Sequence, residues 1–265
     1  MTKLFLSLFL VSSFVCAQTK ELTPVASKVY KWSELEVVKR PKGEARPILE
    51  GTTPHFKLFK VHATTINPKS RMRDTEYTQE NEELIIVKEG VLTVTVEGKT
   101  KDLKPGGIAL IMSGDKRSLV NNSDKSATYY VFQLNSVASL DIDRGKTAGG
   151  SLLLNWDETE FKGHDKGGRR NFFDRPTSMS KRFEMHVTTL SGNWMSHPAH
   201  RHPAAEILLL VNSQEGEADS QAKETIDGVW HDSKVGDIIF LNSNVPHGLQ
   251  NTSKGSCTYF AFQFE

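Results

Sequence analysis

The chain contains an internal repeat, and this feature constrains its fold more than any other. Residues 32–66 and 156–190 align without a gap at an offset of 124 positions, so that the run HATT at His62 corresponds to HVTT at His186. Further along, TYYVFQ at 128–133 corresponds to TYFAFQ at 258–263, at an offset of 130. The larger offset predicts extra residues in the second copy, and we expect them in the polar stretch around Gln214 to Glu224. Two tandem copies of one unit are the expected domain plan.

Each copy has the sequence pattern of β-strands rather than of helices. Short apolar runs such as ELIIV, VLTVTVEG and IALIM recur between turn residues, and residues 91–97 alternate in polarity with the period of two expected for a half-buried strand. Gly90, Gly98 and the run Pro105-Gly106-Gly107 mark turns between these segments. Many short strands separated by glycine-rich turns predict an all-β sandwich or barrel.

The first residues have a different pattern. One lysine precedes an apolar stretch from Leu4 to Val15, and the run Val15-Cys16-Ala17 has the small-residue character of a cleavage site. This order predicts a secretory signal peptide over residues 1–17, because the apolar run is too short to span a bilayer comfortably. A buried N-terminal strand and a lipid anchor on Cys16 are the alternatives. We therefore expect an exported protein, periplasmic or secreted, and favour a lipoprotein less.

The charge balance gives no reason to expect nucleic acid or an anionic membrane as a partner. The chain has 33 Lys and Arg residues against 32 Asp and Glu residues, a formal net charge of +1, and no basic stripe or acidic tail. A small molecule is the expected partner. We expect no membrane span, and a homodimer stays open.

Residues 197–211, HPAHRHPAAEILLLV, have the pattern of a metal site. In a strand, His200, His202 and Glu206 have the same parity, so their side chains can point to one side. Two imidazoles and a carboxylate that converge on one point are typical of a site for a divalent metal. His247, which follows a Gly-Asp turn and a strand, is the expected fourth ligand. A solvated basic loop is the alternative, but it does not explain Glu206 or His247.

These segments resemble the two sequence motifs of the cupin superfamily. The first motif, His-x-His and then Glu, is matched over residues 200–206. The second, a Gly-Asp turn, a strand and then His with a later Asn, is matched over residues 236–251, although Asn242 and Asn244 stand where the family often has Pro and Gly. Since the resemblance covers both repeats, it implies a bicupin, that is, tandem double-stranded β-helix (jelly-roll) barrels.

The repeat and this resemblance together predict two domains, of which only the second binds metal. Residues 29–135 would form an N-terminal cupin domain without metal ligands, 136–151 a linker, and 152–265 a C-terminal cupin domain that binds one divalent ion (Mn, Fe, Zn or Ni). The expected function is that of a metal-dependent enzyme, an isomerase, lyase, hydrolase or dioxygenase, acting on a small polar metabolite, with a sugar-derived compound as one candidate. A non-catalytic binding or sensor bicupin is the alternative, and a storage or structural bicupin is a third.

The first copy lacks the three histidines of this motif. Aligned on Glu83, it has other side chains at their positions, in chain order Tyr77, Gln79 and Arg117. Glu82 is adjacent, so this register is open by one residue. If Glu83 points inward, its charge needs a partner, and Arg117 is the candidate. The alternative places both on the surface.

Three further histidines and two tryptophans need an interpretation. His197 has the opposite parity to His200 and is expected outside the metal site. His62 and His186 occupy equivalent positions, so we expect both to be structural histidines inside the barrels, with their hydrogen bonds made within the protein. The alternative is that His186 lines a pocket and acts as an acid or base. Equivalent positions also predict that Trp32 and Trp156 are packing residues.

Overall fold

The computed structural model describes residues 21–212 and 220–265 of the 265-residue chain. The predicted signal peptide, residues 1–17, lies outside the described residues. Within them, no helix is both long and apolar enough to cross a membrane. The described residues form one short α-helix, α1 (Ile142–Thr147), and two 3-10 turns, η1 (Trp32–Glu34) and η2 (Trp156–Glu158).

The rest of the regular structure is β. The strands of the first half are β1 (Lys28–Tyr30), β2 (Val38–Arg40), β3 (Gly43–Gly51), β4 (Phe56–Ile66), β5 (Ser70–Arg71), β6 (Glu82–Glu89), β7 (Leu92–Val96), β8 (Lys99–Leu103), β9 (Ile108–Ile111), β10 (Arg117–Asn121) and β11 (Ala127–Ser136). Those of the second half are β12 (Leu152–Leu154), β13 (Phe161–His164), β14 (Gly167–Arg175), β15 (Phe183–Leu190), β16 (Ala205–Val211), β17 (Gln221–Ile226), β18 (Val229–Lys234), β19 (Ile238–Leu241), β20 (His247–Asn251) and β21 (Cys257–Phe264).

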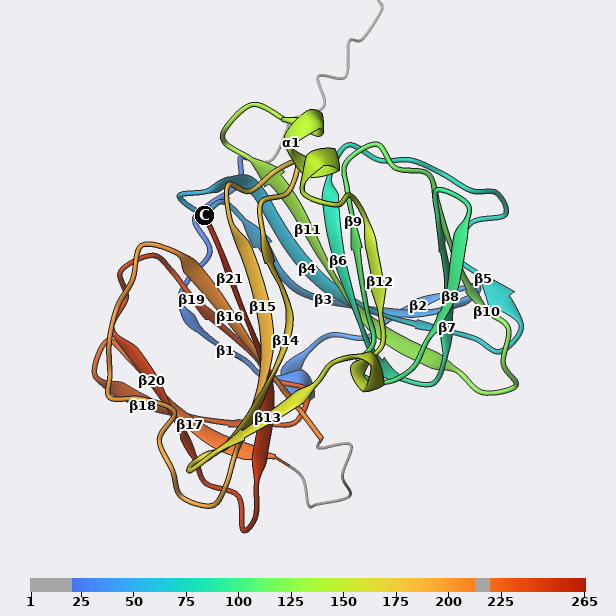
Figure 1. Cartoon of the computed structure of the whole chain (residues 1–265). Helices are drawn as coiled ribbons and strands as arrows, with labels where there is room; N and C mark the ends of the chain where they lie inside the picture. The colour runs from blue at the N-terminus through green and yellow to red at the C-terminus, as the bar shows by residue number, and fades with distance from the viewer. Residues whose placement is uncertain (1–20, 213–219) are drawn as a thin grey trace, which may run out of the picture.

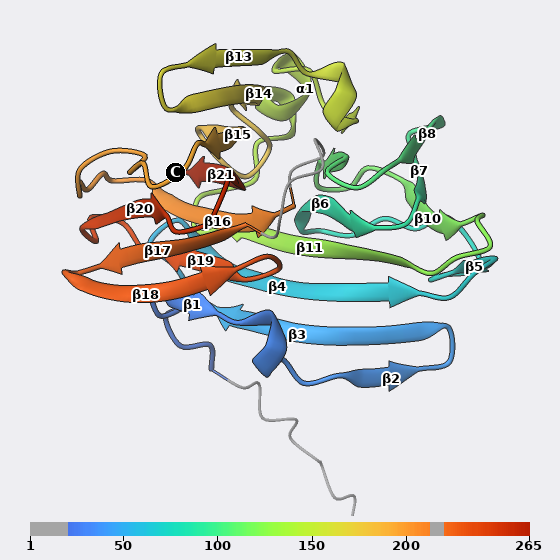
Figure 2. The same cartoon turned by 90° about the horizontal axis from the view of Figure 1, so that it is seen from below.

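These strands form two lobes, each made of a large and a small antiparallel sheet (Figure 1). The first lobe has the sheet β12-β9-β6-β11-β4-β3-β2 and the smaller sheet β5-β10-β7-β8. The second lobe has the sheet β1-β19-β16-β21-β15-β14-β13 and the smaller sheet β18-β17-β20. Seen at right angles, the two smaller sheets lie at opposite sides of the molecule (Figure 2). The prediction of an all-β fold with tandem jelly-roll barrels is confirmed.

Each lobe receives one edge strand from the other half of the chain. Strand β1 pairs with β19, with Val29 opposite Ile239. Strand β12 pairs with β9, with Leu153 opposite Ala109. Between the halves, α1 lies in the stretch predicted as a linker, and Asp141 caps it by accepting the Arg144 N–H. The domain boundaries at 29–135, 136–151 and 152–265 stay predictions.

The period of two along each strand divides the apolar side chains between separate cores. On β11, Tyr129 and Val131 face the interior of the first lobe, whereas Tyr130 and Phe132 belong to a cluster that the two large sheets share. Across this shared core Phe132 meets Phe262 edge-on at 4.9 Å between ring centroids. Each fully buried Phe contributes about 1.5–3 kcal/mol. The aromatic packing between the large sheets therefore holds the two lobes together.

The two predicted packing tryptophans contact this shared core. Trp156 is buried and lies edge-on to Phe260, at 5.6 Å between ring centroids. Trp32 is half-buried and meets Tyr130 at 5.7 Å. Both are packing residues, as their repeat predicted.

Candidate metal centre

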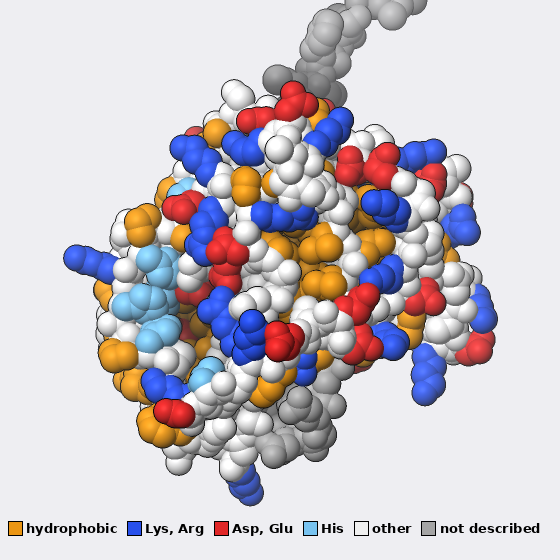
Figure 3. All heavy atoms as spheres, in the orientation of Figure 1, with side chains coloured by type: hydrophobic (Ala, Val, Ile, Leu, Met, Phe, Trp, Pro, Cys, Tyr) orange, Lys and Arg blue, Asp and Glu red, His pale blue; other side chains and the backbone are white. Residues whose placement is uncertain are grey.

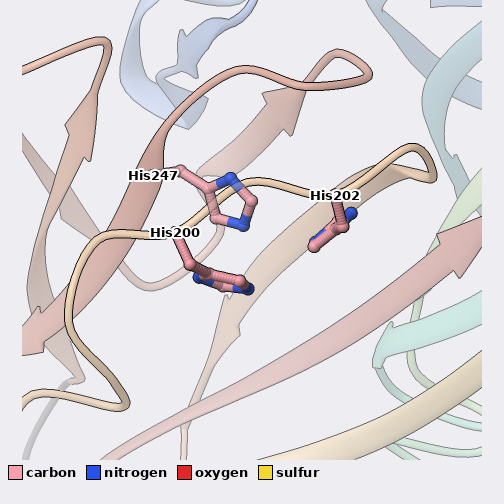
Figure 4. Close-up of side chains that lie close together, drawn as sticks. All are labelled: His200, His202 and His247. Atoms are coloured by element: carbon pink, nitrogen blue, oxygen red, sulfur yellow. The ribbon is translucent and has the colours of Figure 1, made fainter.

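Three histidines of the second lobe converge at the start of β20. His200 and His247 form an isolated β-bridge, in which each backbone N–H donates to the other's carbonyl oxygen at 2.9–3.0 Å. One ring nitrogen from each of His200, His202 and His247 lies within 4.8 Å of the other two. Figure 4 shows the three side chains gathered around one point. His200 and His202 lie in the segment before β16, so the bridge to β20 gathers them, and not one continuous strand as the parity argument supposed.

Backbone carbonyl groups fix the protonation of two of these rings. His202 Nδ1 lies 2.9 Å from the carbonyl oxygen of Ala204, and His247 Nδ1 lies 2.8 Å from that of Val245. A carbonyl oxygen can only accept, so each Nδ1 carries a proton, and in the neutral ring the lone pair lies on Nε2. This arrangement orients imidazoles for metal binding through Nε2. The donor set therefore fits a divalent ion.

The carboxylate of Glu206 lies beside two of the histidines. Its Oε2 is 3.0 Å from His247 Nε2 and 3.4 Å from His202 Nε2, and Gln263 Nε2 donates to Oε1 at 3.3 Å. Burial alone would raise the pKa of Glu206, but interactions with His202 and His247 outweigh it and lower that pKa well below its usual range. Glu206 is thus an anion placed to offset the charge of a cation. The full set of four ligands stays a prediction, because the close grouping of ligand atoms among the described residues contains the three histidines without Glu206.

The histidines feel opposing influences on their pKa values. Burial, reinforced by the neighbouring imidazoles, lowers the pKa of His200. The hydrogen bond with Glu206 raises the pKa of His202. The ring of His197 lies 4.0 Å from that of His200 between centroids, but His197 is outside the grouping of three.

A cavity of about 290 Å³ opens onto this cluster. Polar side chains on its wall include Arg169, His164 and Ser196. His186 also faces it, and His186 Nδ1 lies 2.7 Å from Glu184 Oε1. His186 is therefore hydrogen-bonded, as predicted, and at the same time lines the cavity. On the surface, histidines gather over the second lobe (Figure 3).

The equivalent histidine of the first lobe differs. His62 is half-buried and its Nδ1 has no hydrogen-bond partner within the part of the chain that the structure describes. Burial lowers the pKa of His62 to about 4, so the ring is neutral. It borders a cavity of about 890 Å³ over β3 and β4, whose lining contains no other imidazole. This larger cavity has no converging metal ligands among its described lining residues.

The first lobe replaces the cluster with a buried ion pair. Arg117 Nη2 lies 3.1 Å from Glu83 Oε2, and the two side chains are 0% and 5% exposed. The guanidinium of Arg117 also lies over the ring of Tyr77, 5.2 Å from its centroid. Tyr77 forms an isolated bridge with Arg117, as His200 does with His247, which fixes the register on Glu83. The predicted Glu83–Arg117 pair is confirmed.

One cavity residue escaped the sequence reasoning. Glu224 was placed in the expected insertion, but it lies on β17 and lines the cavity of the histidine cluster. The neighbouring turn could have revealed this. Asp227-Gly228 corresponds to Glu97-Gly98 at the offset of 130, and Asp227 and Glu97 both have a positive φ, at 50° and 47°.

Comparison with known proteins agrees with this geometry. The model of the cupin domain matches residues 63–133 and 186–262, which together make up more than half of the chain. The chain belongs to the cupin family. No curated protein matches its sequence.

Several solved structures share the fold at low sequence identity. AerE from Microcystis aeruginosa is 13% identical, with a TM-score of 0.64, over 87% of this chain and 97% of that one. The oxalate decarboxylase of Lactobacillus farciminis is 12% identical, with a TM-score of 0.66, over 92% and 87%. The oxalate decarboxylase of Bacillus subtilis, described with Mn(II) centres, is 13% identical, with a TM-score of 0.64, over 92% and 78%. At these identities the likeness shows the fold alone.

Proposed function

We propose that this cupin is an exported, metal-dependent enzyme that acts on a small polar metabolite in its second lobe. The observation that carries the proposal is the convergence of His200, His202 and His247 on one point, with the Nε2 lone pairs of His202 and His247 directed away from their carbonyl partners. The fold itself does not require these histidines, because an ion pair occupies the equivalent place in the first lobe. Export rests on the predicted signal peptide alone.

The expected ligands are His200, His202, Glu206 and His247, and the expected ion is Mn, Fe, Zn or Ni. When bound, such an ion would supply a Lewis acid that polarises an oxygen atom of a ligand or lowers the pKa of a water molecule. The chain itself holds the imidazoles of His202 and His247 in the required tautomer and supplies the Glu206 carboxylate. Manganese is the first ion to test, because a bicupin of the same fold is described with Mn(II) centres.

The cavity limits the substrate. A volume of about 290 Å³ suits a small metabolite. Arg169 and His164 on its wall offer hydrogen-bond donors to oxygen atoms of a substrate. A hydroxy acid or another sugar-derived acid satisfies both conditions. The reaction would be an isomerisation, elimination, decarboxylation, hydrolysis or dioxygenation, each of which the Lewis acidity of such an ion would assist.

The test begins with the purified mature protein. Bound metal is measured by mass spectrometry after reloading with each of the four ions, and turnover is followed on a panel of small hydroxy, keto and sugar acids. We expect one ion per chain and metal-dependent turnover, both lost in His202→Ala. The matched control is Gln79→Ala, at the same place in the first copy, which should change neither.

Two results would redirect the proposal. One bound ion and saturable binding of a panel compound without turnover would favour the binding or sensor bicupin. An absence of bound metal under every condition would refute the enzyme proposal. Export is checked separately, by the N-terminal mass of the protein recovered outside the cytoplasm, which should correspond to cleavage after Ala17.

A further inference from the structure

The cavity of the histidine cluster contains a second acidic residue, Glu224. Its side chain is 0% exposed, and neither carboxyl oxygen has a hydrogen-bond partner among the described residues. It lines the same cavity as His200, Glu206 and His247. A buried polar group without a partner costs about 1–3 kcal/mol, and more when it is charged. No hydrogen bond to Glu224 among the described residues offsets this cost.

The strand register places Glu224 in an otherwise apolar row. On β17, Glu224 lies opposite Leu249 of β20, two residues along from the pair Ile226 and His247. Alternate residues of a strand share a face, so Ala222, Glu224 and Ile226 all point into the lobe. Ala222 and Ile226 belong to its apolar core, together with Leu249. An apolar residue at position 224 would complete this core.

The first copy has that apolar residue. On β7, Val94 lies opposite Leu119 of β10, as Glu224 lies opposite Leu249, and Val94 is fully buried in the core of the first lobe. The two positions are therefore structurally equivalent. The acid is present in the lobe that has the histidine cluster, and valine is present in the lobe that has the ion pair.

The electrostatic surroundings favour the neutral acid. Burial raises the pKa of Glu224 well above its usual range, and the charge of Glu206 adds to this. The backbone N–H of Gly248 lies near enough to oppose the shift in part, but it does not meet hydrogen-bond geometry. A neutral carboxyl group has one O–H donor. Glu224 can thus give a hydrogen bond to an acceptor that enters the cavity, and a neutral acid costs less to bury than an anion.

We propose that Glu224 holds the ligand of this site, by donating a hydrogen bond to a carbonyl or carboxylate oxygen of a small molecule bound beside the histidine cluster. This inference rests on the proposed function, because the metal would bind the same molecule. The ligand class is narrowed to compounds with at least two oxygen functions, one for the metal and one for Glu224. Hydroxy acids and keto acids belong to this class.

The test compares wild type with Glu224→Gln and Glu224→Val. Gln keeps a hydrogen-bond donor, and Val is the residue that the first copy has in this place. All three proteins are loaded with Co(II), whose absorption reports both stoichiometry and coordination, and are titrated with glycolate, the smallest hydroxy acid. Thermal unfolding of each protein without metal confirms that it folds.

We expect one Co(II) per chain in all three proteins. Glycolate should bind Glu224→Gln within about twofold of wild type and Glu224→Val at least about fivefold more weakly, the loss that corresponds to one hydrogen bond. Equal glycolate affinity in wild type and Glu224→Val would overturn this inference and leave the proposed function intact. Loss of Co(II) from Glu224→Val, or no glycolate binding by Co(II)-loaded wild type, would also overturn it. No Co(II) binding by wild type would instead refute the proposed function, and this inference with it.

Discussion

A buried carboxyl group at the contact between the lobes should make the stability of the protein depend on pH. Glu82 on β6 is 0% exposed, and its Oε2 accepts hydrogen bonds from Ser178 Oγ at 2.8 Å and from the backbone N–H of Met179 at 3.2 Å. Burial outweighs these bonds and raises the pKa of Glu82 from 4.5 to about 6. Folded and unfolded chains therefore bind this proton with different affinity.

The sign and size follow from this difference. Between pH 4.5 and 6 the folded protein keeps a proton that the unfolded chain has lost, so the free energy of unfolding falls as the pH rises through this window. Below it the contribution of Glu82 is fully present, and above it the contribution is lost. A pKa difference of about 1.5 corresponds to a loss of about 2 kcal/mol.

The substitution Glu82→Gln isolates this effect, because the amide oxygen can still accept both hydrogen bonds and the side chain no longer titrates. Urea unfolding of wild type and variant is measured from pH 4 to pH 8, and the difference between the two cancels all other titrating groups. We expect Glu82→Gln to gain about 2 kcal/mol on wild type between pH 4 and pH 8. A difference that stays constant across this range would refute the reasoning.

Three further predictions concern the two equivalent sites. Arg117→Met should lower the free energy of unfolding, measured with urea, by about 3–5 kcal/mol, because it leaves the buried carboxylate of Glu83 without its partner. Adding Glu83→Gln to this variant should recover much of the lost stability, and no recovery would contradict the pairing. His202→Ala should lose bound metal in mass spectrometry while Gln79→Ala binds as wild type does; equal metal content in both would exclude His202 as a ligand. Co(II) affinity should fall as the pH drops through about 6.5, since protonated imidazole cannot bind metal. Because Glu206 raises the pKa of His202, the loss of affinity should begin at a higher pH than for an isolated histidine. A Co(II) affinity that is constant from pH 8 to pH 5 would argue against histidine ligands.

The sequence alone allows the fold and the position of the site to be predicted because the duplication lets each half of the chain be compared with the other. An offset that holds for 35 residues implies two equivalent units, and the replacement of three histidines in one unit identifies the other as the candidate metal site. The same comparison led to the Glu83–Arg117 pair, since an acid kept inside a barrel must be neutralised.

Where the two copies differ in length, this comparison fails. Glu224 follows the extra residues of the second copy, so the offset of 124 misses its partner Val94, which is found at the offset of 130 and by the strand register. The exchanged edge strands were beyond sequence reasoning for another reason. Strands β1 and β12 have three residues each, which is too short to establish a period, and their partners are chosen by the shape of a sheet edge that forms only in three dimensions.

The exchanged strands also set an order of events during synthesis. Val29 of β1 pairs with Ile239 of β19, so one of the first segments to be made pairs with one of the last. Until β19 is complete, β1 has no partner, and the first lobe still lacks β12 when its own strands are finished. Contacts of such long range are slow to form, and open sheet edges invite pairing with other chains. The nascent chain is therefore most exposed to aggregation before its second lobe is complete.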